Sequence, residues 1–111
     1  MTVDEIYLEI AHNIIDAIET QWTVAIITCE LAEDAGRFKG IYKEDIESAV
    51  DHDFGVSYET YKAFKNLHEI TTEGGENKWN RAKFTLYPTG KFSIDFEWDQ
   101  GLANEIQANS M

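Results

Sequence analysis

The stretch that decides the fold is residues 79–99, which read WNRAKFTLYPTGKFSIDFEWD. Two alternating runs, 79–87 and 91–99, flank a Pro-Thr-Gly tripeptide. Proline suits the first position of a tight turn and glycine suits a left-handed position, so the tripeptide predicts a three-residue hairpin loop. The two runs are therefore expected to be adjacent antiparallel strands.

The loop also sets the register of this hairpin, because Tyr87 must then face Lys91. The apolar face is expected to pair Leu86 with Phe92, Phe84 with Ile94 and Ala82 with Phe96. The polar face is expected to pair Thr85 with Ser93, Lys83 with Asp95 and Arg81 with Glu97. A slip of one residue would turn the aromatic side chains to water, so the register should be unique.

A first helix is predicted over residues 2–20, where apolar residues recur every three or four positions. Thr2 is a candidate N-cap, and Glu5 completes a capping box. The outer face of this helix carries acids without a cation four residues on to pair with them. These acids are Asp4, Glu5, Glu9, Asp16 and Glu19.

Two strands are predicted next, over 22–32 and 37–42, with a turn at 33–36 between them. The first of these strands is β-branched, aromatic and apolar on both faces, which indicates a central position in the sheet, covered on more than one side. Residues 44–59 have weak periodicity, and we expect an irregular acidic excursion with a short helical turn near 46–50.

Ser57 is a candidate N-cap for a second helix, along which Tyr58, Tyr61, Phe64, Leu67 and Ile70 recur every three residues until Gly74 and Gly75. A short helix is expected over 100–109. The order α-β-β-α-β-β-(α) predicts one α+β domain, 1–111. In it an antiparallel sheet of about four strands has helices packed on one face.

Charge is the most unusual bulk property, since the formal net charge is −12. Residues 1–36 hold eight acids and residues 92–111 hold four, and neither segment contains Lys or Arg. Nucleic acid is a poor partner for such a chain, because phosphate binding relies on Lys and Arg. A basic protein is a good partner, because complementary fields speed encounter. The alternative is that the charge only keeps the protein soluble.

Motifs for catalysis or cofactor binding are not found. The sequence lacks a phosphate-binding glycine loop, a nucleophile elbow and a zinc-binding His-Glu-x-x-His. Cys29 is interpreted as a small buried hydrophobe. The pairing of His12 with Asp16, and the triplet 51–53, are weak candidates for a cation site. Trp79 and Trp98 either seal the edge of the core or form an exposed binding patch.

Localisation follows from two further observations. Residues 1–5 carry no basic residue, unlike the charged start of a secretory signal, and no stretch approaches the roughly 18 apolar residues of a membrane span. We therefore expect a cytoplasmic protein, without cofactor or metal and not bound to a membrane.

Several stretches, taken together and in this order, are similar to a known family. They are 6–11 (IYLEIA), 22–24 (WTV) with the apolar strand after it, the helix start at 56–64, and 79–98. The chain resembles the YezG-like immunity proteins, also called antitoxins, over most of its length. It is shorter between Tyr58 and Trp79 than members of that family often are.

The resemblance implies a protein that is not an enzyme and that binds and neutralises a cognate toxin. Such toxins are often nucleases delivered between competing bacteria, by type VII secretion or contact-dependent growth inhibition. The resemblance brings no binding residues with it, so the toxin-binding residues are inferred from charge alone. The first candidates are Glu44, Asp45, Glu47, Asp51 and Asp53, and the second are Asp95, Glu97 and Asp99.

Two other classes of function stay open at this point. A small-molecule-binding or enzymatic domain would show a concave pocket with convergent polar groups. A scaffold or oligomerisation domain would bury an aromatic surface, such as one around Trp79 and Trp98, between copies.

Overall fold

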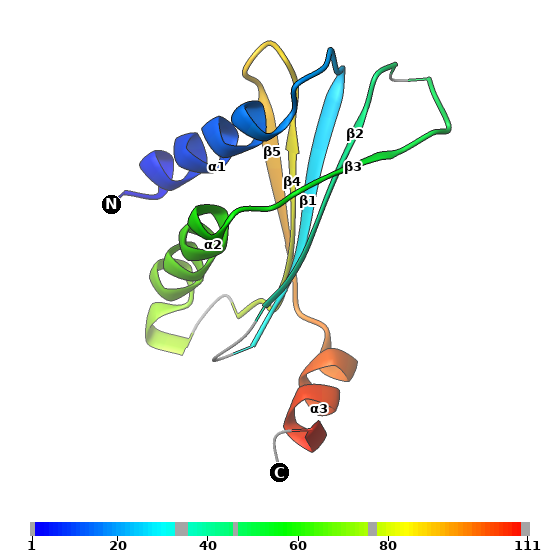
Figure 1. The fold of residues 1–111 in the computed structure, drawn as a ribbon. Helices are drawn as coiled ribbons and strands as arrows, with labels where there is room; N and C mark the ends of the chain where they lie inside the picture. The colour runs from blue at the N-terminus through cyan, green and yellow to red at the C-terminus, as the bar shows by residue number, and fades with distance from the viewer. Residues whose placement is uncertain (1, 33–35, 46, 76–77, 110–111) are drawn as a thin grey trace.

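A computed structural model describes residues 2–32, 36–45, 47–75 and 78–109. It has the expected α+β architecture (Figure 1). The elements in chain order are α1 (Val3–Ala17), β1 (Val24–Leu31), β2 (Gly36–Lys43), β3 (His52–Phe54), α2 (Tyr58–Thr71), a short 3₁₀ helix η1 (Glu73–Gly75), β4 (Arg81–Leu86), β5 (Phe92–Glu97) and α3 (Gln100–Asn109). The sheet is antiparallel and its strand order is β3-β2-β1-β4-β5. It therefore has five strands rather than the four expected.

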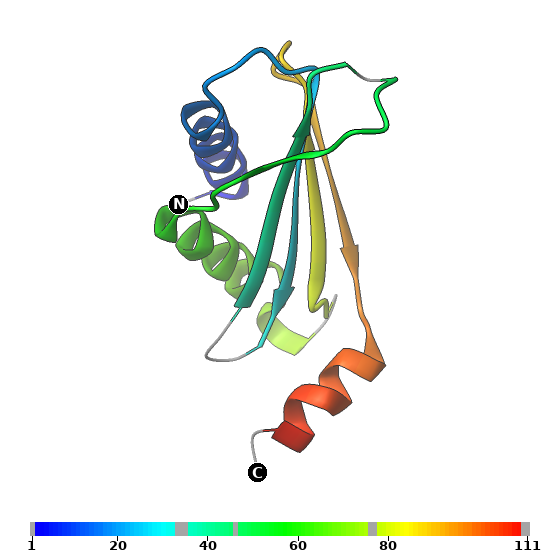
Figure 2. The same ribbon diagram turned by 45° about the vertical axis from the view of Figure 1, so that its right-hand side comes forward.

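The helices α1 and α2 lie on the same face of the sheet, and no helix of the described residues covers the opposite face (Figures 1 and 2). The chain leaves β5 at the lower end of the sheet and forms α3 there, away from the other two helices. Side chains alternate across each strand, so every strand sends one set of residues toward the helices and the other set toward the open face. The prediction of helices on one face is confirmed.

The hairpin has the register that its turn predicted. Phe84 faces Ile94, and the five other pairs follow as expected. The Tyr87 amide donates to the Lys91 carbonyl at 2.9 Å, and Gly90 has a φ of +92°, the left-handed conformation that favours glycine. The local turn chemistry and the alternation of apolar residues agree, which is why this part of the fold could be derived from sequence.

Both helix starts are also as predicted. The Thr2 side chain accepts from the Glu5 amide, and the Glu5 carboxylate accepts from the Thr2 amide, which completes the capping box. Ser57 caps α2 by accepting from the Thr60 amide. The first helix ends at Ala17, three residues earlier than expected.

The apolar face of α2 differs from the expected spacing of three. The residues of α2 that are buried are Thr60, Ala63, Phe64 and Leu67. Tyr58 and Ile70, at the two ends of the expected row, are exposed. An α-helix has 3.6 residues per turn, so a row with a strict spacing of three drifts off the buried face at both ends.

Strand β1 is central, as expected, but only one of its faces is covered by helices. Ala25, Ile27, Cys29 and Leu31 are buried on the helical side, whereas Thr28 on the other side is exposed. Cys29 is buried and in the core, and burial raises the pKa of its thiol to about 12. A neutral buried thiol is a packing group, as the sequence suggested.

The strand that sequence analysis missed is β3, which lies within the segment expected to be irregular. Phe54 packs over Gly40, where an added Cβ would lie 2.7 Å from the phenyl ring, and His52 stacks on Tyr42 with 5.1 Å between ring centroids. These contacts come from β2, so the pattern of β3 itself does not reveal them. The prediction of a helical turn near 46–50 was wrong, because the described residues there form a non-helical turn and bends.

Candidate functional site

The two acidic groups chosen from sequence lie at opposite edges of the sheet. Residues 44–53, called the acidic segment below, connect β2 to β3 and run along β3 to Asp53. The second group lies on and after β5, at the other edge. Figure 1 shows the acidic segment arching away from the upper end of β2, whereas β5 runs down toward α3. The two groups are therefore separate surfaces.

The acidic segment holds five carboxylates on exposed residues, with a single Lys beside them. The Lys43 ammonium lies 3.4 Å from the Asp51 carboxylate and donates to the Ser48 carbonyl at 3.0 Å, so it joins the two ends of the loop. The Asp45 carboxylate accepts from the Glu47 amide at 3.1 Å. Lys43 and the five acids sum to −4, which leaves most of the negative charge without an internal partner.

The triplet 51–53 does not converge on a cation site, because the successive residues His52 and Asp53 of β3 face opposite sides of the sheet. His52 turns toward the helical face, where it stacks on Tyr42 and lies 3.9 Å from a Glu44 oxygen. Asp53 is paired with Ile41 and faces the open side. Among the described residues, no group of three or more His, Cys, Asp or Glu side chains could hold a metal ion.

The open face of the sheet carries charge in columns of alternating sign. Strands β2 and β4 contribute the cations and β3, β1 and β5 contribute the acids. The cations are Arg37, Lys39, Lys43, Arg81 and Lys83, and the acids are Asp53, Glu30, Asp95 and Glu97. Asp95 and Glu97 thus lie beside a column of cations, as Asp53 does on β3, whereas the other four acids of the acidic segment lie between the strands and outside these columns.

The ion pairs expected across the hairpin differ from those found, although the register is right. Lys83 and Asp95 face each other, but these two described side chains form no ion pair. Arg81 turns away from Glu97 and instead contacts Asp99 at 2.9 Å and Glu30 at 3.7 Å. A long side chain follows the local arrangement of carboxylates, which register alone does not determine.

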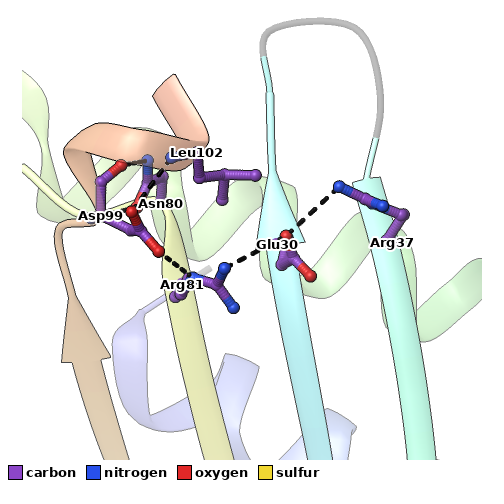
Figure 3. A network of polar contacts seen from close by, with 6 residues as sticks. All are labelled: Glu30, Arg37, Asn80, Arg81, Asp99 and Leu102. Carbon is purple, nitrogen blue, oxygen red and sulfur yellow. Dashed lines mark hydrogen bonds and ion pairs between the residues drawn. The ribbon is translucent and has the colours of Figure 1, made fainter. Parts of the chain in front are cut away.

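Asp99 belongs to a network that fastens α3 to the sheet (Figure 3). One of its carboxylate oxygens accepts from the Leu102 amide at 3.0 Å and the other from the Arg81 side chain. The Asn80 side chain bonds to both backbone groups of Asp99. The Asp99 amide donates to the Asn80 side-chain oxygen at 2.8 Å, and the Asn80 side-chain NH₂ donates to the Asp99 carbonyl at 2.9 Å. The hydrogen bond from Leu102, and then the Arg81 guanidinium, lower the pKa of the Asp99 carboxyl.

These contacts give Asp99 a structural role as the N-cap of α3, and they separate it from Asp95 and Glu97. The network continues through Glu30 to Arg37, whose guanidinium lies 3.4 Å from the same Glu30 oxygen that Arg81 approaches. This network was not predicted from the sequence. An aspartate placed directly before a helix is an N-cap signal that could have indicated it.

The two tryptophans have different surroundings. Trp79 is buried, and its indole N–H donates to the Thr71 hydroxyl at 2.8 Å while its backbone carbonyl contacts the His68 ring. Trp98 is 46% exposed. Trp79 therefore seals the core, and Trp98, directly after β5, is exposed at the surface.

The outer surface of α1 is a third acidic surface, which the charge pattern had indicated. Asp4, Glu5 and Asp16 are exposed there, and so are the large apolar residues Leu8 and Ile15. Within the described residues, no helix is both long and apolar enough to cross a bilayer.

Comparison with known proteins identifies the family of this chain. A model of the family described as "Immunity protein YezG-like" matches residues 3–110. The chain is also 24% identical to the Immunity protein YezG of Bacillus spizizenii, over 95% of this chain and 74% of that protein. Because the family model spans almost all of the chain, the protein belongs to the YezG-like family of immunity proteins.

Proposed function

We propose that this protein neutralises a basic toxin domain, a nuclease, by covering its nucleic-acid-binding surface with the acidic segment 44–53. Membership of an immunity protein family supports the protective role. The observation that carries the choice of surface is the group of five carboxylates on exposed residues, which retains a charge of −4 after Lys43 is counted.

The physical reason is that a nuclease must be basic where it grips nucleic acid. A carboxylate-rich loop at the edge of a rigid sheet can occupy that surface in place of phosphates. Complementary charge also speeds the encounter, which matters when an active toxin must be captured before it cuts. The protein acts in this proposal by binding alone, in the cytoplasm of the cell that makes it.

The second surface, Asp95 and Glu97, is the weaker candidate, because the cations of β4 lie beside it. We do not include Asp99 in the toxin-binding surface, because its carboxylate already accepts hydrogen bonds from Leu102 and Arg81. Glu47 and Asp53 are the best residues to change, because neither side chain forms an ion pair within the described part of the chain.

The test uses the toxin domain encoded beside this protein's own gene, inactivated for expression, and measures binding at several salt concentrations. The double variant Glu47→Lys, Asp53→Lys should bind at least about tenfold more weakly at low salt, mainly through slower association. The control is Asp16→Lys, Glu19→Lys, which makes the same change in net charge at the end of α1.

Equal loss in both double variants would mean that net charge matters and the acidic segment does not. Unchanged binding of the Glu47→Lys, Asp53→Lys variant would overturn the proposed surface. A toxin domain that cuts neither DNA nor RNA would overturn the nuclease assignment while leaving the protective role intact.

A further inference from the structure

Strand β5 forms one edge of the sheet and its outer side has no neighbouring strand in the described chain. The Tyr87 amide bonds to the Lys91 carbonyl, and hydrogen-bonded pairs alternate along an antiparallel ladder. Ser93, Asp95 and Glu97 therefore direct their backbone groups toward β4. The amides and carbonyls of Phe92, Ile94 and Phe96 point outward, away from the sheet.

The same edge exposes aromatic side chains on the helical face. Phe92 is 40% exposed and Phe96 is 41% exposed, although Tyr7 packs on the first and Trp79 on the second. Beside Phe96 lies an open groove of about 600 Å³ that is lined by Val3, Ile70, Thr71, Lys78, Trp79 and Phe96. The helical layer thus stops short of β5 and leaves an apolar strip along a free backbone edge, which is a typical docking surface.

We propose that a second copy of this chain occupies this edge, with the two β5 strands antiparallel and Ile94 on the two-fold axis. In this register Phe92 lies opposite Phe96 of the second copy, on the helical face beside the groove. On the open face Lys91 lies opposite Glu97 of the second copy. The two-fold axis repeats each of these pairs, so two aromatic pairs and two opposite-charge pairs form.

Other registers are less favourable. Side chains alternate along each β5 strand, so the helical faces of the two copies coincide only when the two-fold axis passes through a residue and not between two residues. An axis at Asp95 would set that carboxylate directly opposite its own copy, where like charges repel. An axis at Ser93 shortens the ladder and leaves Phe96 beyond the paired strands. Only the register with the axis at Ile94 combines a long paired ladder with opposite charges across the interface.

The resulting dimer has one continuous sheet with both helical layers on the same face. The two acidic segments then lie at the two outer edges, as far from the axis as the sheet allows. Dimerisation is therefore compatible with the toxin-binding surface proposed above and does not depend on it.

The experiment measures the mass of the isolated full chain by sedimentation equilibrium over micromolar concentrations. A dimer of twice 12.7 kDa is expected. Lys91→Glu and Glu97→Lys should each weaken the dimer about tenfold or more, because each places two like-charge pairs across the interface. The double variant Lys91→Glu, Glu97→Lys should restore it, and the control Lys39→Glu, on β2, should leave it unchanged.

A backbone test complements the charge swap. Ile94→Pro removes an outward N–H without removing a bond to β4, since proline is tolerated where the N–H of an edge strand faces solvent. The variant should be monomeric and keep its circular dichroism spectrum. A monomeric parent chain, a dimer that survives Ile94→Pro, or a charge swap that fails to restore association would each overturn the proposal. If the parent chain is monomeric and Ile94→Pro abolishes toxin binding, the β5 edge pairs with a strand of the toxin instead.

Discussion

The two edges of the sheet end in different ways. Strand β5 pairs with β4 over six residues through a local turn, and it presents a regular backbone ladder flanked by aromatic rings. Strand β3 has three residues, follows an irregular connection, and is held by rings that pack on β2. A short, charged edge resists pairing with other strands, whereas a long regular edge invites it. The molecule therefore has one edge suited to electrostatic contact and one suited to strand pairing.

The largest expected effect is loss of the core beneath the β5 edge. Phe84 is fully buried and stacks on Phe92 with 5.3 Å between ring centroids. Phe84→Ala should lower the free energy of unfolding by about 3–5 kcal/mol, measured by urea denaturation. Phe54→Ala, which removes a partly buried ring at the β3 edge, should cost less. Equal losses of unfolding free energy in the two variants would mean that both edges of the sheet depend equally on core packing.

The packing of β3 on the sheet can be disrupted by adding a methyl group beneath the Phe54 ring. A Cβ at Gly40 would lie 2.7 Å from two atoms of the Phe54 ring, so Gly40→Ala must displace that ring. A loss of about 1–3 kcal/mol is expected, together with faster amide exchange in β3 and little change in β5. Gly55→Ala is the matched control, since an added Cβ there meets nothing within 4 Å. Retained protection of β3 in the Gly40 variant would contradict the packing argument.

The turn that sets β5 against β4 can be tested through backbone strain alone. Gly90 has a φ of +92° and open space around it, so Gly90→Ala adds strain without a clash. We expect a loss of roughly 1–2 kcal/mol in urea denaturation. A neutral result would show that the hairpin does not depend on its left-handed residue.

The smallest effect concerns the charge that joins the end of β5 to α3. Asn can replace Asp as an N-cap, so Asp99→Asn removes the charge and keeps the cap. Because folding lowers the pKa of Asp99, its ionised form stabilises the native state above the ordinary carboxyl pKa of about 3.9. That contribution is lost as the pH falls through the lowered folded pKa.

Thermal midpoints of Asp99→Asn and the parent chain should therefore differ at pH 7 and converge in the acidic range. Asp95, on β5, lacks the Leu102 and Arg81 donors that Asp99 has, so the effect of Asp95→Asn at pH 7 should be smaller. A difference between Asp99→Asn and the parent that persists at acidic pH would assign the effect to geometry and not to charge.

The hairpin and the helix starts were predictable because their causes are local. The Pro-Thr-Gly loop determines the register, and Thr2 and Ser57 cap helices whose first turns follow them directly in sequence. The acidic segment was also visible as composition. Its neighbour β3 was not, because three residues carry too little pattern and its stabilising contact is with Gly40, more than ten residues earlier.

The candidate site was predictable in part. Sequence located the carboxylates but not which of them are already used inside the molecule. Asp99 and Glu97 are two residues apart in the same acidic run, yet Asp99 is held by Leu102 and Arg81 whereas Glu97 is exposed. Such partners depend on how α3 and β1 come together around Arg81.

The sequence by itself determined the helix-and-hairpin plan, the strand register of the hairpin, the surplus of negative charge and the resemblance to immunity proteins. The tertiary structure alone decided that the two acidic groups lie at opposite edges, that cations separate them on the open face, and that β5 presents a free aromatic edge. The physical reason is range. Turn conformation, capping and periodicity act between residues a few positions apart, whereas the arrangement of charges and edges depends on strand order, which is settled when distant segments pack around one core.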